Sequence, residues 1–310
     1  MHAIQTTAPH LVIAMSILSN ACGGSPKETP AAAAPAPLTV EEWRAKHDVD
    51  YRRDYVSIAG MHDLKPGANT AGSAPGHDIL LPASTPATLG RFVLAGDRVR
   101  FEPASGVDVR VGDRPVTAAM DLRDDRTVER DELLIGDVRL VVHASGDARM
   151  LRVRDPDSDL AKGFLGFDWF TEDPQYRVVG RFLPDPSAQT MKVPNTFGDL
   201  DEFKSEGVVE FTLRGQTLRL RPFTTRPNRL YFVFRDASSG QETYKAARFL
   251  YSDLLPDGTT VLDFNIAYNP PCAFNPYTTC PIPLAENRLP VKILAGEKKY
   301  PAEVALPTRN

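Results

Sequence analysis

The chain lacks the short motifs that mark the common enzyme classes. It has no G-x-S-x-G nucleophile turn, no H-E-x-x-H zinc motif, no phosphate-binding loop and no G-x-G-x-x-G after a strand. Lys and Arg form no dense block, and 36 basic against 40 acidic residues give a net charge of −4. That balance argues against a nucleic acid held by its phosphates. We therefore expect no nucleic-acid partner and no cofactor.

The first 22 residues contain no Asp, Glu, Lys or Arg. They include the apolar run 11–18, which is too short to span a bilayer as a helix and is followed by small residues up to Cys22. The sequence Ala21-Cys22-Gly23 resembles a lipoprotein processing site, so we expect 1–22 to be a signal peptide and Cys22 to be lipidated. The alternative is an ordinary cleaved signal peptide in which Cys22 has no role. Residues 23–38, rich in Pro and Ala, are predicted to be an extended linker.

A short helix and many short strands are predicted after the linker. Thr39 followed by Glu42 forms a capping-box pattern before the amphipathic stretch that runs to about Tyr55. Beyond it, apolar runs alternate with Gly-containing turns every 8–12 residues, which is the spacing of a β-sandwich. We expect a helix plus sandwich over 39–145 and a second, barrel-like β-rich unit over 146–310.

The sandwich region resembles a forkhead-associated domain. The likeness is carried by Gly72-Ser73, His77–Pro82, Val109–Val116 and Gly136-Asp137, which occur in the order of that family. In the family an Arg after the early Gly, and a Ser and a His on the next loop, hold a phosphothreonine. Here Ser73 replaces the Arg, and Ser84-Thr85 is not followed by a His. The resemblance therefore implies the fold and argues against phosphopeptide binding.

Most of the chain resembles the bacterial family known as domain of unknown function 1684. The resemblance covers about residues 43–300 and is most specific in the run Asn269-Pro270-Pro271-Cys272. Further support comes from Trp43, Gly67–Asn69, Arg152–Pro156 and the strand-rich stretch 229–300. The family carries no established activity or catalytic residues, so the resemblance implies relatives and names no reaction.

Polar and aromatic side chains gather in residues 242–288, which are otherwise strand and Pro-rich loop. They are Tyr244, Arg248, Tyr251, Asp263, Asn265, Tyr268, Asn269, Glu286 and Asn287. Alternation along a strand would place Asp263 and Asn265 on one face. One interpretation is a small-ligand site in which Asp263 or Glu286 is an acid or base and Arg248 binds an anion. The other is that these side chains fix the loop by hydrogen bonds to its backbone.

Cys272 and Cys280 are predicted to form a disulfide, because an exported protein meets an oxidising environment. A metal site would need more ligands, and no His follows His143, so we expect no metal. A cysteine nucleophile would need His47, His62, His77 or His143 to approach from the first unit.

These observations predict a lipoprotein of the cell envelope, anchored to a membrane through Cys22. Its expected activity is binding of a small molecule or an envelope protein through the 242–288 face. The alternative is a hydrolase-like enzyme that uses Asp263, Glu286 and Arg248 in one cleft.

Replacing Cys22 by Ala removes the lipid attachment point, so we expect the variant to become soluble in the envelope compartment. Membrane fractionation measures this directly. Cys272→Ala keeps Cys22 and is the matched control, which should remain with the membranes. A Cys22→Ala protein that still sediments with membranes would exclude a lipid anchor at this residue.

Overall fold

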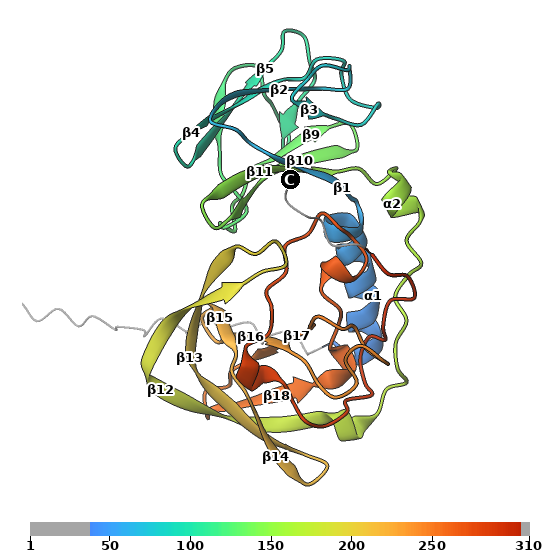
Figure 1. The fold of residues 1–310 in the computed structure, drawn as a ribbon, viewed down its shortest axis with the longest axis vertical. Helices are drawn as coiled ribbons and strands as arrows, with labels where there is room; N and C mark the ends of the chain where they lie inside the picture. The colour runs from blue at the N-terminus through green and yellow to red at the C-terminus, as the bar shows by residue number, and fades with distance from the viewer. Residues whose placement is uncertain (1–37, 305–310) are drawn as a thin grey trace, which may run out of the picture. The chain divides into compact units, whose positions relative to one another are not determined.

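The computed structural model describes residues 38–304. The predicted signal peptide 1–22 with its Cys22, residues 23–37 of the predicted linker, and residues 305–310 lie outside this part. No helix within residues 38–304 is long and apolar enough to cross a membrane. The described chain is mostly β with one short helix at its start, as the sequence predicts (Figure 1).

Helix α1 (Val40–Tyr51) begins at the predicted capping box. The Thr39 hydroxyl accepts the Glu42 N–H at 3.2 Å, and the Glu42 carboxylate accepts the Thr39 N–H at 2.8 Å. These two bonds satisfy backbone donors that the first helical turn leaves free. The helix continues into one π-helical turn (Arg52–Val56), and the chain then enters the first strand.

Eleven strands form two sheets in the first half of the described chain. The six-stranded sheet has the order β1 (Ile58–Asp63), β11 (Ala148–Arg154), β10 (Val138–Ser145), β9 (Glu132–Ile135), β6 (Arg110–Val111) and β7 (Arg114–Pro115). The five-stranded sheet has the order β3 (Ile79–Leu80), β2 (Gly67–Gly72), β4 (Gly90–Ala95), β5 (Arg98–Pro103) and β8 (Met120–Leu122). Only the β2–β3 pair is parallel among these strands.

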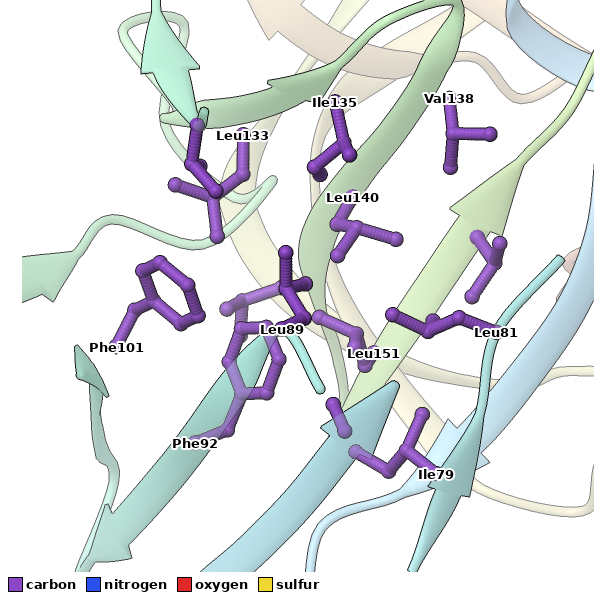
Figure 2. Close-up of a cluster of buried hydrophobic side chains, with 14 of the residues drawn as sticks. Ile79, Leu81, Leu89, Phe92, Phe101, Leu133, Ile135, Val138, Leu140 and Leu151 are labelled. Carbon is purple, nitrogen blue, oxygen red and sulfur yellow. The ribbon is translucent and has the colours of Figure 1, made fainter. Parts of the chain in front are cut away.

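One apolar core lies between these two sheets. Phe92 of β4 and Phe101 of β5 pack with ring centroids 5.0 Å apart, and they share a buried cluster with Leu140 of β10 and Leu151 of β11. Figure 2 shows these side chains directed into a common space. Two sheets that bury their facing sides in one core form a β-sandwich, which is the predicted architecture.

The sandwich extends beyond its predicted end at residue 145. Strand β11 (Ala148–Arg154) pairs with both β1 and β10, so it lies in the sandwich and not in the second unit, where the predicted boundary placed it. Pairing on both edges decides its position, and sequence alone does not show which strands are partners. The helix α1, which the prediction grouped with the sandwich, packs its Tyr51 in a cluster of C-terminal residues instead.

Seven further strands form a barrel-like arrangement. A four-stranded sheet has the order β14 (Gln216–Leu220), β13 (Leu200–Leu213), β12 (Arg177–Pro194) and β18 (Thr259–Asp263). A three-stranded sheet has the order β15 (Phe223–Arg226), β16 (Arg229–Phe234) and β17 (Arg248–Asp253). Strand β15 lies against β13 and β17 lies against β18, so the two sheets meet at both edges around one core.

The three-stranded sheet is buried on both faces. Leu230, Phe232 and Phe234 of β16 enter the barrel core, whereas Tyr231 and Val233 of the same strand enter a second, aromatic cluster. Successive side chains of a strand point to opposite faces. This strand therefore reads as a continuous apolar run, because helix α1 and C-terminal loops cover the face that does not line the barrel.

Residues 264–304 carry little regular structure. They contain three short 3-10 turns, at Phe264–Ile266, Pro271–Ala273 and Ala285–Asn287. Backbone N–H and C=O groups in such loops need hydrogen-bond partners other than those of a neighbouring strand. Buried side chains supply many of them, as the candidate site shows.

Substitution of Gly296 tests how closely this C-terminal segment packs against its neighbours. A Cβ added there would lie 2.7 Å from the Phe264 carbonyl oxygen and would also collide with the Ala267 carbonyl oxygen. Gly215 has nearly the same φ, 77° against 78°, but nothing lies within 4 Å of its added Cβ. We expect Gly296→Ala to lower the free energy of unfolding by roughly 3 kcal/mol or more, and Gly215→Ala by about 1 kcal/mol.

Chemical denaturation of the two variants measures this difference. Equal losses would mean that the positive φ alone matters and that the close packing around Gly296 contributes nothing.

Candidate functional site

Arg248 is fully buried and is already paired. Its Nη1 donates to Asp236 Oδ2 at 2.9 Å and to the Ile293 carbonyl oxygen at 3.0 Å, and its Nη2 donates to the Ala295 carbonyl oxygen. Both side chains of the Arg248–Asp236 pair have 0% exposure. Arg248 therefore binds the C-terminal segment to β17 and is not available to bind a solute anion.

Asp263 and Asn265 lie together, but not through strand alternation as predicted: β18 ends at Asp263, and Asn265 is in the 3-10 turn Phe264–Ile266 that Asp263 caps. Asp263 Oδ1 accepts from the Asn265 backbone N–H at 3.0 Å and from Asn265 Nδ2 at 2.9 Å. Asn265 in turn bonds both backbone groups of Asp173, at 2.9 and 3.0 Å. Asp263 also lies 3.5 Å from Arg177.

Asn287 and Glu286 contact Arg221, away from Asp263 and Arg248. Asn287 Nδ2 donates to the Arg221 and Val233 carbonyl oxygens, each at 2.9 Å, and its Oδ1 accepts the Arg221 N–H at 2.8 Å. Glu286 pairs with Arg221 Nε at 2.7 Å and keeps 48% of its side chain exposed. Asp263, Glu286 and Arg248 thus have three separate partners, and they make no ion pair with one another within residues 38–304.

Asn269 is bound to a carboxyl group that the sequence analysis missed. Glu297 accepts the Asn269 backbone N–H and its Nδ2–H, both at 2.8 Å, and Asn269 Nδ2 also donates to the Lys298 carbonyl oxygen at 2.8 Å. Glu297 is 1% exposed. Burial raises the pKa of Glu297 to about 8, although the Asn269 bonds and the positive charge of Arg248 oppose the shift.

The predicted disulfide is not present: Cys272 and Cys280 are free, buried thiols. Neighbouring side chains contact each sulfur, since the Tyr244 hydroxyl lies 3.7 Å from Cys272 Sγ and Cys280 Sγ lies 3.9 Å from Thr278 Oγ1. Burial raises the pKa of the Cys280 thiol well above its usual value. The loop is held by backbone and Asn275 hydrogen bonds instead of a covalent link.

Five tyrosines from five parts of the chain meet in the aromatic cluster, and we call them the tyrosine cluster. They are Tyr51 of α1, Tyr55 of the π turn, Tyr231 of β16, Tyr251 of β17 and Tyr268 after the first 3-10 turn. Ring centroids are 4.6 Å apart for Tyr51 and Tyr55, 5.5 Å for Tyr51 and Tyr268, and 4.5 Å for the stacked pair Tyr231 and Tyr251. Tyr251 and Tyr268 belong to the predicted face, and the other three were missed.

The hydroxyl groups of this cluster are incompletely bonded. The Tyr51 hydroxyl acts on that of Tyr268, and the hydroxyls of Tyr55, Tyr231 and Tyr251 make no hydrogen bond within the described part of the chain. These three oxygens are not among the fully buried atoms that lack a partner, so they reach solvent-accessible space. Burial raises the pKa of all five, so they stay protonated and can donate at neutral pH. Tyr51, Tyr231 and Tyr268 keep 8%, 6% and 7% exposure, so solvent still reaches these side chains.

His47 of α1 packs beside this cluster. Its ring lies 4.1 Å from that of Tyr51, 4.8 Å from that of Tyr268, and stacks on Trp43 at 4.8 Å. Burial lowers the pKa of His47 to about 3, despite the nearby acidic residues of the helix. Its imidazole is therefore neutral at pH 7, and its buried Nε2 has no hydrogen-bond partner in the described residues.

Two buried arginines on the outer face of the sandwich act on Tyr55. Arg152 and Arg154 alternate with the core residues Leu151 and Val153 along β11, so both point away from the sandwich core. Their positive charges lower the pKa of Tyr55, against the larger effect of burial. Both guanidinium groups are partly bonded: Arg152 Nη1 lies 3.1 Å from Asp125 Oδ2, and Arg154 Nε donates to the Asp54 carbonyl oxygen at 2.8 Å.

Each of these arginines keeps one buried nitrogen without a partner. Arg152 Nε and Arg154 Nη1 make no hydrogen bond in residues 38–304, and the nearest carboxylate oxygen to Arg154 Nη1, in Glu132, is 4.0 Å away. The pKa of Arg154 is lowered to about 10 by burial and by the charge of Arg152. Unpaired donors of buried cations are costly and are filled by an anion where one can enter.

A cavity of about 560 Å³ lies beside chain neighbours of these residues, although its lining includes no cluster tyrosine and neither Arg152 nor Arg154. Its lining includes Val56, which follows Tyr55 in the chain, and Arg139, which pairs with Arg154 across the sheet. Leu134, Pro156 and Ala161 give it an apolar floor, and Arg52 and Arg53 add basic groups. The volume lies in the range of small-molecule sites.

A model of the family described as "Protein of unknown function (DUF1684)" matches residues 162–298. This confirms the predicted resemblance over that stretch. No match is found among curated proteins.

Two solved structures are similar to parts of the chain. One is the solution NMR structure of an uncharacterized protein of Haloarcula marismortui, with 29% identity and a TM-score of 0.38, covering 46% of this chain and 82% of that one. The other is the FhaA FHA domain, solved in a complex, with 15% identity and a TM-score of 0.22, covering 30% of this chain and 97% of that one.

Glu297 predicts a pH dependence of stability. Its pKa is about 8 in the folded chain and about 4.5 when unfolded, so its contribution to stability is complete below pH 4.5 and is lost as the pH rises to 8. The slope from this group is about 1.4 kcal/mol per pH unit within that window. We expect Glu297→Gln to remove the slope, and Glu286→Gln, at an exposed carboxyl, to keep it.

Urea denaturation at pH 5, 6, 7 and 8 measures both variants. A Glu297→Gln protein with the wild-type slope would show that Glu297 is ionised in the folded state throughout the window.

Proposed function

We propose that the protein is a lipoprotein of the cell envelope that binds a small acidic molecule with an aromatic or apolar body. The site is the tyrosine cluster together with Arg152 and Arg154. The observation that carries the proposal concerns Tyr55, one of three cluster tyrosines whose hydroxyls make no hydrogen bond in residues 38–304. It lies in the field of two buried guanidinium groups that each keep a donor without a partner in those residues. Attachment through Cys22 is the second part of the proposal and rests on the sequence.

The chemistry of the site favours an acid with a flat apolar body. Tyrosine rings offer large rigid faces, and their hydroxyls offer donors at one edge. A carboxylate or phosphate accepts several hydrogen bonds at once, and its charge suits two arginines. The stacked pair Tyr231 and Tyr251, 4.5 Å apart, shows that ring faces of this cluster are arranged for stacking.

A small molecule fits this site better than an envelope protein, which is the other partner that the sequence allowed. Tyr51, Tyr231 and Tyr268 are more than nine-tenths buried, and a protein surface does not reach side chains at such depth. The hydrolase that uses Asp263, Glu286 and Arg248 has no support in the geometry, because each of the three is bound to a different partner.

Binding is tested first with defined probes on residues 23–310 carrying Cys22→Ser. Benzoate and phenyl phosphate are acidic aromatic probes, and benzyl alcohol is the neutral match. We expect both acids, but not the alcohol, to raise the melting temperature and to give saturable heats in calorimetry. Native mass spectrometry of the same protein, as purified, reports any molecule that it already carries.

Tyr231→Phe and Tyr251→Phe identify the site. Each variant deletes a hydroxyl that has no partner in the described residues, so stability should change by less than about 0.5 kcal/mol while probe affinity falls about three- to tenfold. Tyr277→Phe, in a partly exposed loop outside the cluster, is the control and should bind as wild type. Unchanged affinity in both cluster variants, or no binding of either acid by the wild type, would overturn the proposal.

A further inference from the structure

Three side chains from distant parts of the chain form a line of short hydrogen bonds. Asp125 Oδ2 lies 2.6 Å from His143 Nδ1, and His143 Nε2 lies 2.9 Å from Thr279 Oγ1. Asp125 is in the loop before β9, His143 is on β10, and Thr279 is in the C-terminal loop that follows the 3-10 turn Pro271–Ala273. A hydroxyl, an imidazole and a carboxylate in this order are the parts of a nucleophilic triad.

The surroundings fix the direction of these bonds. Asp125 also accepts the Ala144 backbone N–H at 3.1 Å and an Arg152 N–H at 3.1 Å. Burial tends to raise the pKa of Asp125, but the bonds from His143 and Ala144 and the charge of Arg152 bring it down to about 2. An ionised carboxylate can only accept, so His143 carries its proton on Nδ1, and Nε2 is left to accept the Thr279 hydroxyl proton.

His143 is held in the form that a general base requires. It is 7% exposed, and burial together with the charge of Arg152 lowers its pKa, although Asp125 and Asp201 act in the opposite direction. A neutral imidazole at pH 7 can take up a proton from the hydroxyl next to it. Thr279 and Asp125 are both partly exposed, whereas His143 is buried, so an incoming molecule can reach the Thr279 hydroxyl.

We propose that Asp125, His143 and Thr279 are a catalytic triad that hydrolyses a carboxylic ester through an acyl-threonine. Thr279 Oγ1 attacks the ester carbonyl carbon while its proton passes to His143 Nε2. The C–O bond to the alcohol breaks, and the alcohol oxygen takes that proton. Water then attacks the acyl group, His143 removes and returns one proton, and the carboxylic acid and free Thr279 are released.

Two backbone donors next to the Thr279 hydroxyl have no partner in residues 38–304 and can serve the oxyanion of this reaction. The N–H groups of Thr278 and Thr279 donate to no acceptor in residues 38–304, whereas the N–H groups of Tyr277 and Cys280 are bonded to Asn275 and Thr196. An N–H of the nucleophile itself is a common oxyanion donor in acyl transfer. Residues Thr278 and Thr279 thus carry both the proposed nucleophile, Thr279 Oγ1, and two backbone N–H donors.

A charged cavity lies beside chain neighbours of the triad, although none of the three triad residues lines it, and its charge guides the choice of ester. A cavity of about 800 Å³ is lined by Ala144, the neighbour of His143 in the chain, and by Asp201, whose charge acts on His143. Its other charged lining residues are Arg126, Asp147, Lys192, Asp199 and Glu202. Four carboxylates against two cations favour an ester with a neutral or cationic alcohol over an acidic one. This substrate differs from the acidic ligand proposed for the tyrosine cluster.

The decisive experiment uses a fluorophosphonate probe on the folded wild-type protein, followed by peptide mass mapping. We expect a single adduct on Thr279. Thr279→Ser should keep the adduct, while Thr279→Val, with the same shape and no hydroxyl, should lose it. Thr217→Val, at an exposed position of β14, should label as wild type. Absence of an adduct on Thr279 in folded wild-type protein would overturn the proposal.

Ester turnover gives a second readout. Acetylthiocholine and p-nitrophenyl acetate are the cationic and neutral probes, and Thr279→Val and Asp125→Asn should each reduce kcat/KM at least a hundredfold. If the three residues only join the sandwich to the C-terminal loop, the variants will lose stability and the wild type will show no turnover above Thr279→Val. Tyr251→Phe should retain labelling, so failure of the triad and failure of the tyrosine site are separate results.

Discussion

The buried ion pair between Arg248 and Asp236 is the interaction on which the C-terminal half depends. Both side chains are fully buried. Arg248 also donates hydrogen bonds to the carbonyl oxygens of Ile293 and Ala295. Loss of one member of such a pair leaves an uncompensated charge and costs about 3–5 kcal/mol. The pair holds residues 293–297 against β17, and that segment in turn places Glu297 on Asn269.

The remaining contacts extend this arrangement to the sandwich. Asn269 follows Tyr268, so the Glu297 bonds also fix one wall of the tyrosine cluster. A few residues later, Asn275 Nδ2 donates to the Tyr55 and Ile58 carbonyl oxygens at 3.1 and 2.7 Å, which joins the same loop to the π turn and β1. Thr279 is carried on this loop to His143. Both proposed sites are thus assembled by polar side chains that pin an otherwise irregular backbone.

Local structure could be predicted from the sequence, but partners at long range could not. The capping box at Thr39 and the Gly turns of the sandwich depend on neighbouring residues, so their patterns are readable in a single chain. Strand β11 shows how far such patterns reach. Its alternation of apolar and polar residues is the same whether it pairs with β10 or begins a new unit. Asn287 was among the predicted site residues. Its partner Arg221, however, is 66 positions away in the chain, and no local sequence pattern predicts that contact. The free state of Cys272 and Cys280 likewise depends on the side chains packed around them.

The tyrosine cluster escaped detection for a related reason. Tyr51 and Tyr231 occupy positions where the helix and strand patterns call for core residues, and a tyrosine there is read as packing. What separates a structural polar group from one available for function is whether its bonds are complete. Asn265 and Asn287 use both their amide donor and acceptor, which is the behaviour of groups that stabilise the fold.

Arg152 and Arg154 behave differently, because within residues 38–304 each keeps a buried nitrogen without a partner, and both act on Tyr55, whose hydroxyl makes no hydrogen bond there. Each unpaired buried donor costs about 1–3 kcal/mol of stability. Selection for stability alone would replace such a residue by an apolar one. Arg248 also has an Nε without a partner in residues 38–304, but its other nitrogens make three hydrogen bonds, to Asp236 and to the carbonyl oxygens of Ile293 and Ala295. Clustering of incomplete bonds around one spot, and not the number of polar residues along the chain, is therefore the physical sign that distinguishes the tyrosine cluster from the pinned loops around it.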